Sequence, residues 1–231
     1  MLNNKTICII GARKGSKRLP GKNRLCIDGK LLFMYPLEEA KKSKLFDQII
    51  FSTDDNIIIS QLENYAGIIL NKRPPELGTD SATMVEVILY LIEKYSHIME
   101  DCNDICLLTA CNPFRDSNHI KDAYEIYKKK NADALISLTE YPFPPELALD
   151  MENGMIKRSW TGSTRTDQRQ KKYYPNGSVT FFKKLNFLKN KHFYPKNTVG
   201  YILKWPYSID IDYEEEYQLV KKLMEKKQYF L

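Results

Sequence analysis

Short apolar runs alternate with amphipathic stretches through the first 140 residues, and this alternation constrains the fold more than any other feature. The runs that resemble buried strands cover residues 6–10, 48–52, 67–70, 105–108 and 134–138. The stretches with apolar residues at helical spacing cover 31–43, 81–95 and 117–129. Strands that alternate with helices form βαβ units. The sequence therefore predicts a three-layer α/β protein whose mixed, mostly parallel sheet is covered on both faces.

Several residues are expected to fix the ends of these helices. Asp55 can cap the helix that follows the second strand, because its carboxylate can accept an orphan backbone N–H. Thr83 and Glu86 have the spacing of a capping box. Pro36 is compatible with a helix only near the first turn, since proline has no N–H to donate further along.

The character of the sequence changes after Thr139. Residues 141–145 read Tyr-Pro-Phe-Pro-Pro, which breaks regular structure, and residues 146–175 are polar, basic and rich in turn formers. We expect residues 140–175 to leave the sheet as a flap or dimerisation arm within one domain of residues 1–231. Residues 178–182 and 201–204 return to strand pattern, and 214–227 is predicted to be a closing amphipathic helix.

Charge and cysteine content narrow the classes of function. The chain carries 35 Lys and Arg against 29 Asp and Glu, and this mild excess suits nucleic acid, a membrane surface or a phosphorylated small molecule. No apolar run approaches the roughly 20 residues that span a bilayer, and residues 7–10 are too few for a signal-peptide core. The five cysteines lack CxxC spacing. We expect reduced thiols in a cytoplasmic protein without a membrane partner.

A basic loop with three glycines follows the first strand, where residues 11–23 read GARKGSKRLPGKN. It holds five basic residues and no acid. Successive backbone N–H groups in such a loop form an anion-binding nest, and open α/β sheets bind ligands beyond the carboxyl ends of their strands. The loop therefore predicts a site for a polyanion such as a nucleoside triphosphate. It matches neither GxxxxGK[ST] nor GxGxxG, so a solvated basic loop is the alternative.

Two aspartates near the C-terminus form the second candidate cluster. Alternation along an extended segment places Asp210 and Asp212 on one side, with Ile209 and Ile211 on the other. Converging carboxylates repel unless a cation or proton lies between them, and Mg²⁺ binds one or two carboxylates together with phosphate oxygens. The alternative for Asp212 is a helix N-cap with Glu215 at N3.

The basic loop resembles the signature of the acylneuraminate cytidylyltransferases, the CMP-sialic acid synthetases, a family that includes the bacterial enzymes for legionaminic and pseudaminic acids. Further motifs match in order along almost the whole chain, at residues 51–54, 73–77, 80–82, 113–115, 175–177 and 208–212. The resemblance implies a Rossmann-like nucleotidyltransferase fold and a homodimer paired through the arm. It implies transfer of CMP from CTP to the anomeric hydroxyl of a nine-carbon sugar acid, with release of pyrophosphate.

The resemblance also assigns roles to residues on the nucleotide side. The residues expected to bind the nucleotide are Ala12, Arg13, Gly15, Ser16, Lys17, Lys22, Asn23, Arg73, Asp80 and Ala82. Among them, Arg13 and Lys22 are expected to neutralise the triphosphate in catalysis. Asp210 and Asp212 are expected to bind the catalytic Mg²⁺. From the residues alone, Arg73 is equally compatible with a surface arginine.

On the sugar side, Thr109 stands where the family often has Gln, and Asn176 matches an Asn that faces the acceptor. Arg165 or Arg169 is expected to grip the sugar carboxylate, which suits a bidentate guanidinium. Residues 175–177 also read as a simple Pro-Asn-Gly turn. Tyr174 stands where an Arg is common in the family. These departures leave the identity of the sugar acid open.

Two rival functions remain at this point. One is a cytidylyltransferase for the eight-carbon acid Kdo, or a related sugar nucleotidyltransferase. The other is a non-catalytic protein that binds nucleotides or RNA. Because the aromatic residues do not interleave with the basic loop as a base-stacking platform would, we expect no nucleic-acid partner.

Overall fold

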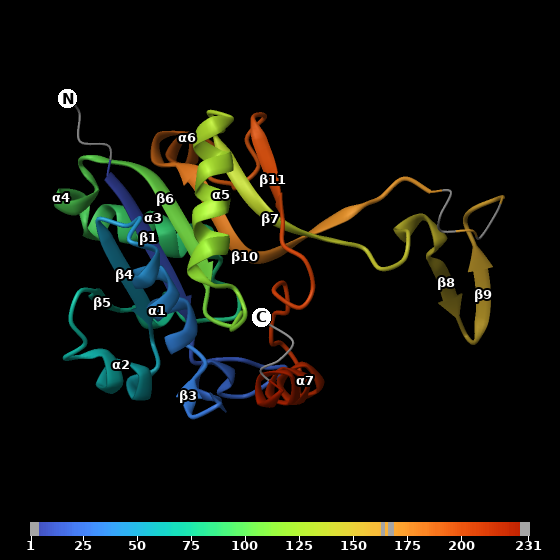
Figure 1. Cartoon of the computed structure of the whole chain (residues 1–231), viewed down its shortest axis with the longest axis horizontal. Coiled ribbons are helices and arrows are strands. Elements are labelled where there is room, and N and C mark those ends of the chain that lie inside the picture. The colour runs from blue at the N-terminus through green and yellow to red at the C-terminus, as the bar shows by residue number, and fades with distance from the viewer. Residues whose placement is uncertain (1–4, 163–164, 166–168, 227–231) are drawn as a thin grey trace.

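The computed structural model describes residues 5–162, 165 and 169–226. Its centre is a seven-stranded sheet with the order β11-β7-β10-β6-β1-β4-β5 (Figure 1). The strands are β1 (Lys5–Ala12), β4 (Gln48–Thr53), β5 (Ile69–Lys72), β6 (Cys102–Thr109), β7 (Ala134–Glu140), β10 (Tyr173–Lys183) and β11 (Thr198–Ile202). Neighbours pair in parallel except at β10, which is antiparallel to both β6 and β7. The predicted mixed, mostly parallel sheet is confirmed.

Helices cover both faces of this sheet, as the alternation predicts. One face packs against α1 (Met34–Ser43), α2 (Asn56–Leu62) and α5 (Ser117–Lys129). The other packs against α3 (Met84–Lys94), α4 (Ser96–Met99) and α6 (Lys184–Asn190). Along β1, Cys8 and Ile10 enter the first core, whereas Ile7 and Ile9 enter the second. This two-residue period is what a strand buried on both faces requires.

The predicted helix signals lie where the sequence places them. Asp55 caps α2 by accepting from the Ile57 N–H at 3.0 Å, and Thr83 forms a capping box with Glu86. Pro36 is the third residue of α1. However, α3 begins at Met84 rather than at residue 81, because residues 79–82 form a turn in which Thr79 Oγ1 accepts the Ala82 N–H.

A third, smaller core joins segments from both ends of the sequence. After the basic loop come the 3-10 turn η1 (Lys22–Arg24) and a small hairpin of β2 (Cys26–Ile27) and β3 (Lys30–Leu31). This region packs against the 209–211 segment and α7 (Glu214–Glu225). The buried members of this core are Leu19, Ile27, Leu32, Cys111, Phe114, Ile209, Ile211 and Val220. Through this core, Leu19 of the basic loop packs in the same cluster as Val220 of the last helix.

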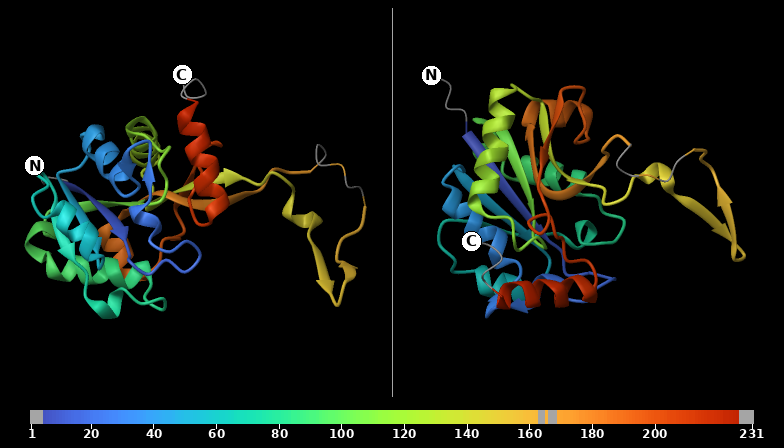
Figure 2. Two further views of the ribbon diagram at one scale, coloured as in Figure 1. Left: turned by 90° about the horizontal axis from the view of Figure 1, so that it is seen from below. Right: turned by 45° about the vertical axis from the view of Figure 1, so that its right-hand side comes forward.

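Between β7 and β10 the chain extends away from the body (Figures 1 and 2). Their pairing continues out to Glu140 and Tyr173, beyond which lie the 3-10 turn η3 (Pro145–Leu147) and a hairpin of β8 (Leu149–Glu152) and β9 (Met155–Arg158). Every residue of both hairpin strands is exposed. We call residues 141–172 the arm. Among the described helices, none has the length and apolar character needed to cross a bilayer.

Candidate active site

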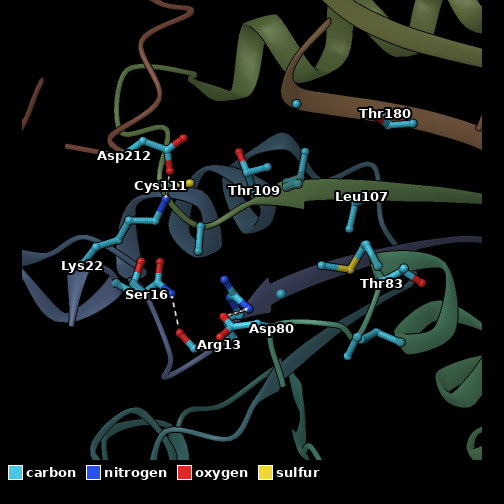
Figure 3. A pocket seen from close by; sticks show the side chains of 18 of the residues that line it. Arg13, Ser16, Lys22, Asp80, Thr83, Leu107, Thr109, Cys111, Thr180 and Asp212 are labelled. Atoms are coloured by element: carbon cyan, nitrogen blue, oxygen red, sulfur yellow. Dashed lines mark hydrogen bonds and ion pairs between the residues drawn. The ribbon is translucent and has the colours of Figure 1, made fainter. Parts of the chain in front are cut away.

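A cavity of about 730 Å³ opens beside the carboxyl ends of β1 and β6. Charged residues of the basic loop, among them Arg13, Lys17 and Lys22, line one part of it, and Asp80 and Asp212 face them (Figure 3). The predicted residues Ser16, Asn23, Arg73, Ala82 and Thr109 also line this cavity. Ala12 is buried at the end of β1, and Gly15 lies on the exposed part of the loop.

Asp80, in the segment that precedes α3, forms ion pairs with two residues of the basic loop. Its carboxylate lies 3.0 Å from Arg13 Nη1 and 2.7 Å from Lys17 Nζ. Arg13 also donates to the Thr79 carbonyl at 3.3 Å. The hydrogen bond from Lys17, together with the charge of Arg13, lowers the pKa of the Asp80 carboxyl below its ordinary value. Asp80 thus aligns two cations along the cavity wall.

The loop's own conformation depends on Asn23 and Gly21. Asn23 is buried and donates from Nδ2 to the Arg13 carbonyl at 3.0 Å, which joins the two ends of the loop. Gly21 has φ of 68°, in the left-handed region that glycine adopts without steric cost. These contacts fix the conformation of the loop on both sides of Lys22.

The basic loop and the C-terminal aspartates meet. Lys22 Nζ lies 2.6 Å from Asp212 Oδ1, and Arg18 Nη2 lies 2.5 Å from Asp212 Oδ2 (Figure 3 shows Lys22 and Asp212). The N-cap alternative for Asp212 is wrong, because α7 begins at Glu214 with Tyr213 as its cap residue. Glu216 accepts the backbone N–H groups of Asp212 and Tyr213. The Asp212 carboxylate is therefore left for the loop cations.

Asp210 does not itself line the cavity, but it interacts with Lys22, Cys111 and Asp212. Burial raises the pKa of its carboxyl, and the positive charge of Lys22 opposes that rise. Its Oδ1 atom is buried and has no hydrogen-bond partner. A buried carboxylate oxygen without a donor, beside a second carboxylate, has the chemistry of a site for a hard divalent cation. Among the described residues no group of three or more acidic, His or Cys side chains is placed to hold a metal ion, so the pair would need ligands from the substrate or water.

Cys111 is a site residue that the sequence analysis treated only as a reduced thiol. It follows the end of β6, lines the cavity, and its thiol lies against Asp210 and Lys22. Burial raises the pKa of this thiol well above its ordinary value, so it is a neutral neighbour of the carboxylate. All five cysteines are free. The sequence signal for Cys111 was its place three residues after the predicted strand 105–108, whose carboxyl end lies at the site.

Arg73 is buried beneath the cavity, and the surface alternative for it is wrong. Its Nε donates to Ser52 Oγ at 3.2 Å and its Nη2 to the Ser52 carbonyl at 3.0 Å. Burial lowers the pKa of the guanidinium. Gly11 lies directly above it, and a Cβ there would approach Arg73 Nη2 to 3.1 Å. Arg73 thus supports the floor beside the end of β1.

The predicted sugar-side residues are divided between two places. Thr109 lines the cavity, and its Oγ1 is buried without a hydrogen-bond partner. Asn176 lies between two cavity-lining residues but directs its amide at β7, donating to Thr139 Oγ1 at 2.8 Å. Arg165 and Arg169 belong to the arm, where Arg169 lies 5.9 Å from the centre of the Trp160 ring. The arm leaves the body, so the structure does not bring these arginines to this chain's own cavity.

The sheet order and the loop that follows β1 define an α/β protein of the Rossmann-like nucleotidyltransferase class. A sequence model of the cytidylyltransferase family matches residues 7–231, and the chain belongs to this family. Among solved structures, CMP:2-keto-3-deoxy-manno-octonic acid synthetase complexed with CTP superposes with a TM-score of 0.70. That comparison covers 97% of this chain and 100% of the other at 16% identity, and it shows the shared fold.

Relatives in sequence carry more specific names. The N-acylneuraminate cytidylyltransferase of Streptococcus agalactiae serotype V is 32% identical over 92% of this chain and 52% of its own length. The chain therefore spans about half the length of that relative. The CMP-N,N'-diacetyllegionaminic acid synthase of Legionella pneumophila is 28% identical over 96% of this chain and 97% of its own length. The pseudaminic acid cytidylyltransferase of Campylobacter jejuni is also 28% identical, over 95% of this chain.

Proposed function

We propose that this protein transfers CMP from CTP to the anomeric hydroxyl of a nonulosonic acid and releases pyrophosphate. One observation carries the proposal: Lys22 of the basic loop and Asp212, which precedes α7, line one cavity and form an ion pair there, with Lys22 Nζ 2.6 Å from Asp212 Oδ1. Membership of the cytidylyltransferase family and the names of the relatives support it.

In this reaction the oxygen of the anomeric hydroxyl attacks the α-phosphorus and gives up its proton to the solvent. As the new oxygen–phosphorus bond forms, the bond from the α-phosphorus to the bridging oxygen breaks, and pyrophosphate leaves with the electron pair of that bond. The protein's contribution is positioning and charge stabilisation, as in other phosphoryl and nucleotidyl transfers. Lys17 and Arg18 are more than half exposed and are held by single carboxylates, so they are able to turn towards phosphate oxygens. Lys22 is largely buried and keeps a fixed charge between the phosphates and the aspartates.

Asp210 and Asp212 are the residues that would hold a Mg²⁺ ion. The unpartnered Asp210 Oδ1 and the nearby Asp212 carboxylate supply the oxygen donors that this ion prefers. When bound, the ion would neutralise charge that develops on phosphate oxygens. The chain's own part is to keep the two carboxylates on one side of the 209–212 segment, which burial of Ile209 and Ile211 on its other side achieves.

We further propose that the protein acts as a homodimer through the arm. The arm exposes apolar side chains, Leu149, Met151, Met155 and Ile156, that a monomer leaves in water. Because Arg165 and Arg169 do not line the cavity of their own chain, either can contact the sugar acid only if the arm reaches a partner's cavity. A cytoplasmic location agrees with the use of CTP.

The test is release of pyrophosphate from CTP and Mg²⁺ with a panel of sugar acids, with the product identified by mass spectrometry. We expect a CMP-sugar with a nonulosonic acid and little turnover with Kdo. Turnover with Kdo alone would favour the rival sugar nucleotidyltransferase. Absence of release with every acid, together with RNA affinity that falls steeply with salt, would favour the non-catalytic rival.

A further inference from the structure

A row of side chains on the α3 face of the sheet changes from apolar to polar as it approaches the cavity. Three isoleucines that pack in or against the second core are paired in register across β1, β4 and β5, namely Ile9, Ile50 and Ile69. Two residues further along these strands, the same pairing joins Gly11, Ser52 and Asn71. Ser52 and Asn71 are completely buried. Packing alone would favour apolar residues there, because a buried polar group costs free energy unless it is hydrogen-bonded.

The hydrogen bonds of this polar row lead to Arg73. Asn71 Nδ2 donates to Ser52 Oγ at 3.0 Å. Asn71 Oδ1 accepts from two groups at the end of α3, Lys94 Nζ at 3.0 Å and Tyr95 Oη at 3.3 Å. Ser52 Oγ accepts a second hydrogen bond, from Arg73 Nε at 3.2 Å. A continuous chain of hydrogen bonds therefore runs from α3 through both buried residues to the guanidinium of Arg73.

The guanidinium of Arg73 is held along one edge. Its Nε and Nη2 atoms donate to the hydroxyl oxygen and the backbone carbonyl of Ser52, and its backbone N–H donates to the Thr53 carbonyl at 2.8 Å. A guanidinium carries five N–H donors in a rigid plane, so the remaining donors lie on another edge. Arg73 lines the cavity together with Gly11, and the absence of a side chain at Gly11 keeps Nη2 accessible from that side. The remaining donors can therefore reach a ligand in the cavity.

Arg73 is also a buried cation whose hydrogen-bond partners are uncharged. Both oxygens that accept from its side chain belong to Ser52. Within the described ranges Arg73 forms no ion pair, and Asp54 acts on it through charge without a hydrogen bond. A guanidinium removed from water needs a negative partner to offset its lost hydration. A nucleotide bound in the cavity would supply that negative charge, so the orientation of Arg73 matters for nucleotide binding.

We propose that Ser52 and Asn71 are positioning residues for nucleotide binding and act through Arg73. Asn71 holds the Ser52 hydroxyl in place, and Ser52 fixes the direction of the open guanidinium edge. Neither of them lines the cavity, so neither touches the nucleotide directly. The inference rests on the proposed function and names two residues on which its CTP affinity depends. A contact that is equally strong with bound CTP and in the transition state changes KM and leaves kcat unaltered.

The first experiment measures KM for CTP and kcat in Ser52→Ala, with Mg²⁺ and a saturating acid that the wild type uses. We expect KM to rise about tenfold or more, the effect of losing one hydrogen bond to a charged group, while kcat changes much less. Ser43→Ala is the matched control, because Ser43 is also buried, donates to the Ala40 carbonyl at 2.7 Å and does not line the cavity. Its KM should equal that of the wild type. An unchanged KM in folded Ser52→Ala overturns the inference.

A double-mutant cycle tests whether the effect passes through Arg73. Arg73→Met keeps an unbranched side chain and removes the N–H donors. If Ser52 acts through Arg73, adding Ser52→Ala to this variant should change KM by less than about twofold, because the contact that it supports is already lost. A rise of the same size in both backgrounds would show that Ser52 acts by another route, and it would refute the positioning role.

Asn71→Ala keeps the inference testable if Ser52→Ala does not fold. It should raise KM about threefold, since Asn71 acts on Arg73 through one neutral hydrogen bond to Ser52. A KM equal to that of the wild type overturns the inference. Urea denaturation verifies that each variant is folded under the assay conditions. Absence of pyrophosphate release by the wild type with every acid overturns the proposed function instead, and calorimetric titration with CTP then still compares the variants.

Discussion

Replacing Asp210 by Asn is expected to lower the catalytic rate without lowering the stability of the folded protein. The change keeps the shape of the side chain and removes one charge from the carboxylate pair. Loss of one group that stabilises developing charge costs about 10²- to 10³-fold in kcat, which is about 3–4 kcal/mol. We expect a loss of this size at saturating CTP and Mg²⁺, with pyrophosphate release as the assay.

The same substitution is expected to leave the stability of the metal-free protein unchanged or to increase it. Burial raises the pKa of Asp210 in the folded state, so the ionised carboxylate disfavours folding at neutral pH. The stability that a carboxyl with a raised folded pKa contributes is fully present below its unfolded pKa and is lost as the pH rises through its folded pKa. Asn has no such penalty. The free energy of unfolding of Asp210→Asn in urea at pH 7 should therefore equal or exceed that of the wild type.

Asp104 provides the matched control for this experiment. It is a buried carboxylate on β6 that accepts from Tyr127 Oη at 2.6 Å and from Lys128 Nζ at 2.9 Å. Asp104→Asn is expected to lose about 1–3 kcal/mol of stability, since hydrogen bonds to a charged group are weakened, while kcat stays unchanged. If Asp210→Asn turns over at a near-normal rate, or loses stability as Asp104→Asn does, the assignment of Asp210 to the metal site is refuted.

Three further outcomes are expected. Lys22→Ala should raise the KM for CTP about tenfold or more, because a charge near the phosphates is lost; an unchanged CTP dependence would make Lys22 a spectator. NMR titration should give the Asp80 carboxyl a pKa below the ordinary 3.8, and Lys17→Ala should raise it, since the hydrogen bond from Lys17 is the main cause of the shift. The stability that the ion pairs of Asp80 contribute is therefore fully present at a pH above its ordinary pKa, and it is lost as the pH falls through its pKa in the folded protein. Ile156→Asp in the arm should yield monomers in sedimentation velocity, and a persistent dimer would exclude this face of the hairpin from the interface.

Much of the body could be predicted because local signals and the tertiary structure agree there. The 117–129 helix has the bounds predicted from its apolar spacing, and the Thr83–Glu86 pair was recognisable as a capping box. Both depend on contacts within one turn of helix. The predicted strand 201–204 instead covers Thr198–Ile202, because its register is set by pairing with β7 rather than by its own residues. The last residue of the predicted closing helix lies outside the described part of the chain.

In the candidate site, too, the residues could be recognised from the sequence, whereas their contacts with distant segments could not. Arg13, Lys22 and Asp212 were recognisable because charge and glycine spacing are visible in sequence, and the structure brings them to one cavity. That Asp80 holds Lys17, or that Cys111 lies against Asp210, depends on segments far apart in the chain. Asn176 was recognisable within a motif, but only the bulge in β10 shows where its amide points.

The third core has a consequence for biosynthesis. Leu19, which belongs to the basic loop, and Ile27 and Leu32, which follow it, are buried in one core with Ile211 and Val220. During translation the loop emerges first, yet the surface on which it rests is made almost two hundred residues later. The core that supports the basic loop is therefore incomplete until α7 has been synthesised. The conformation of the basic loop should therefore depend on α7 as well as on the central sheet.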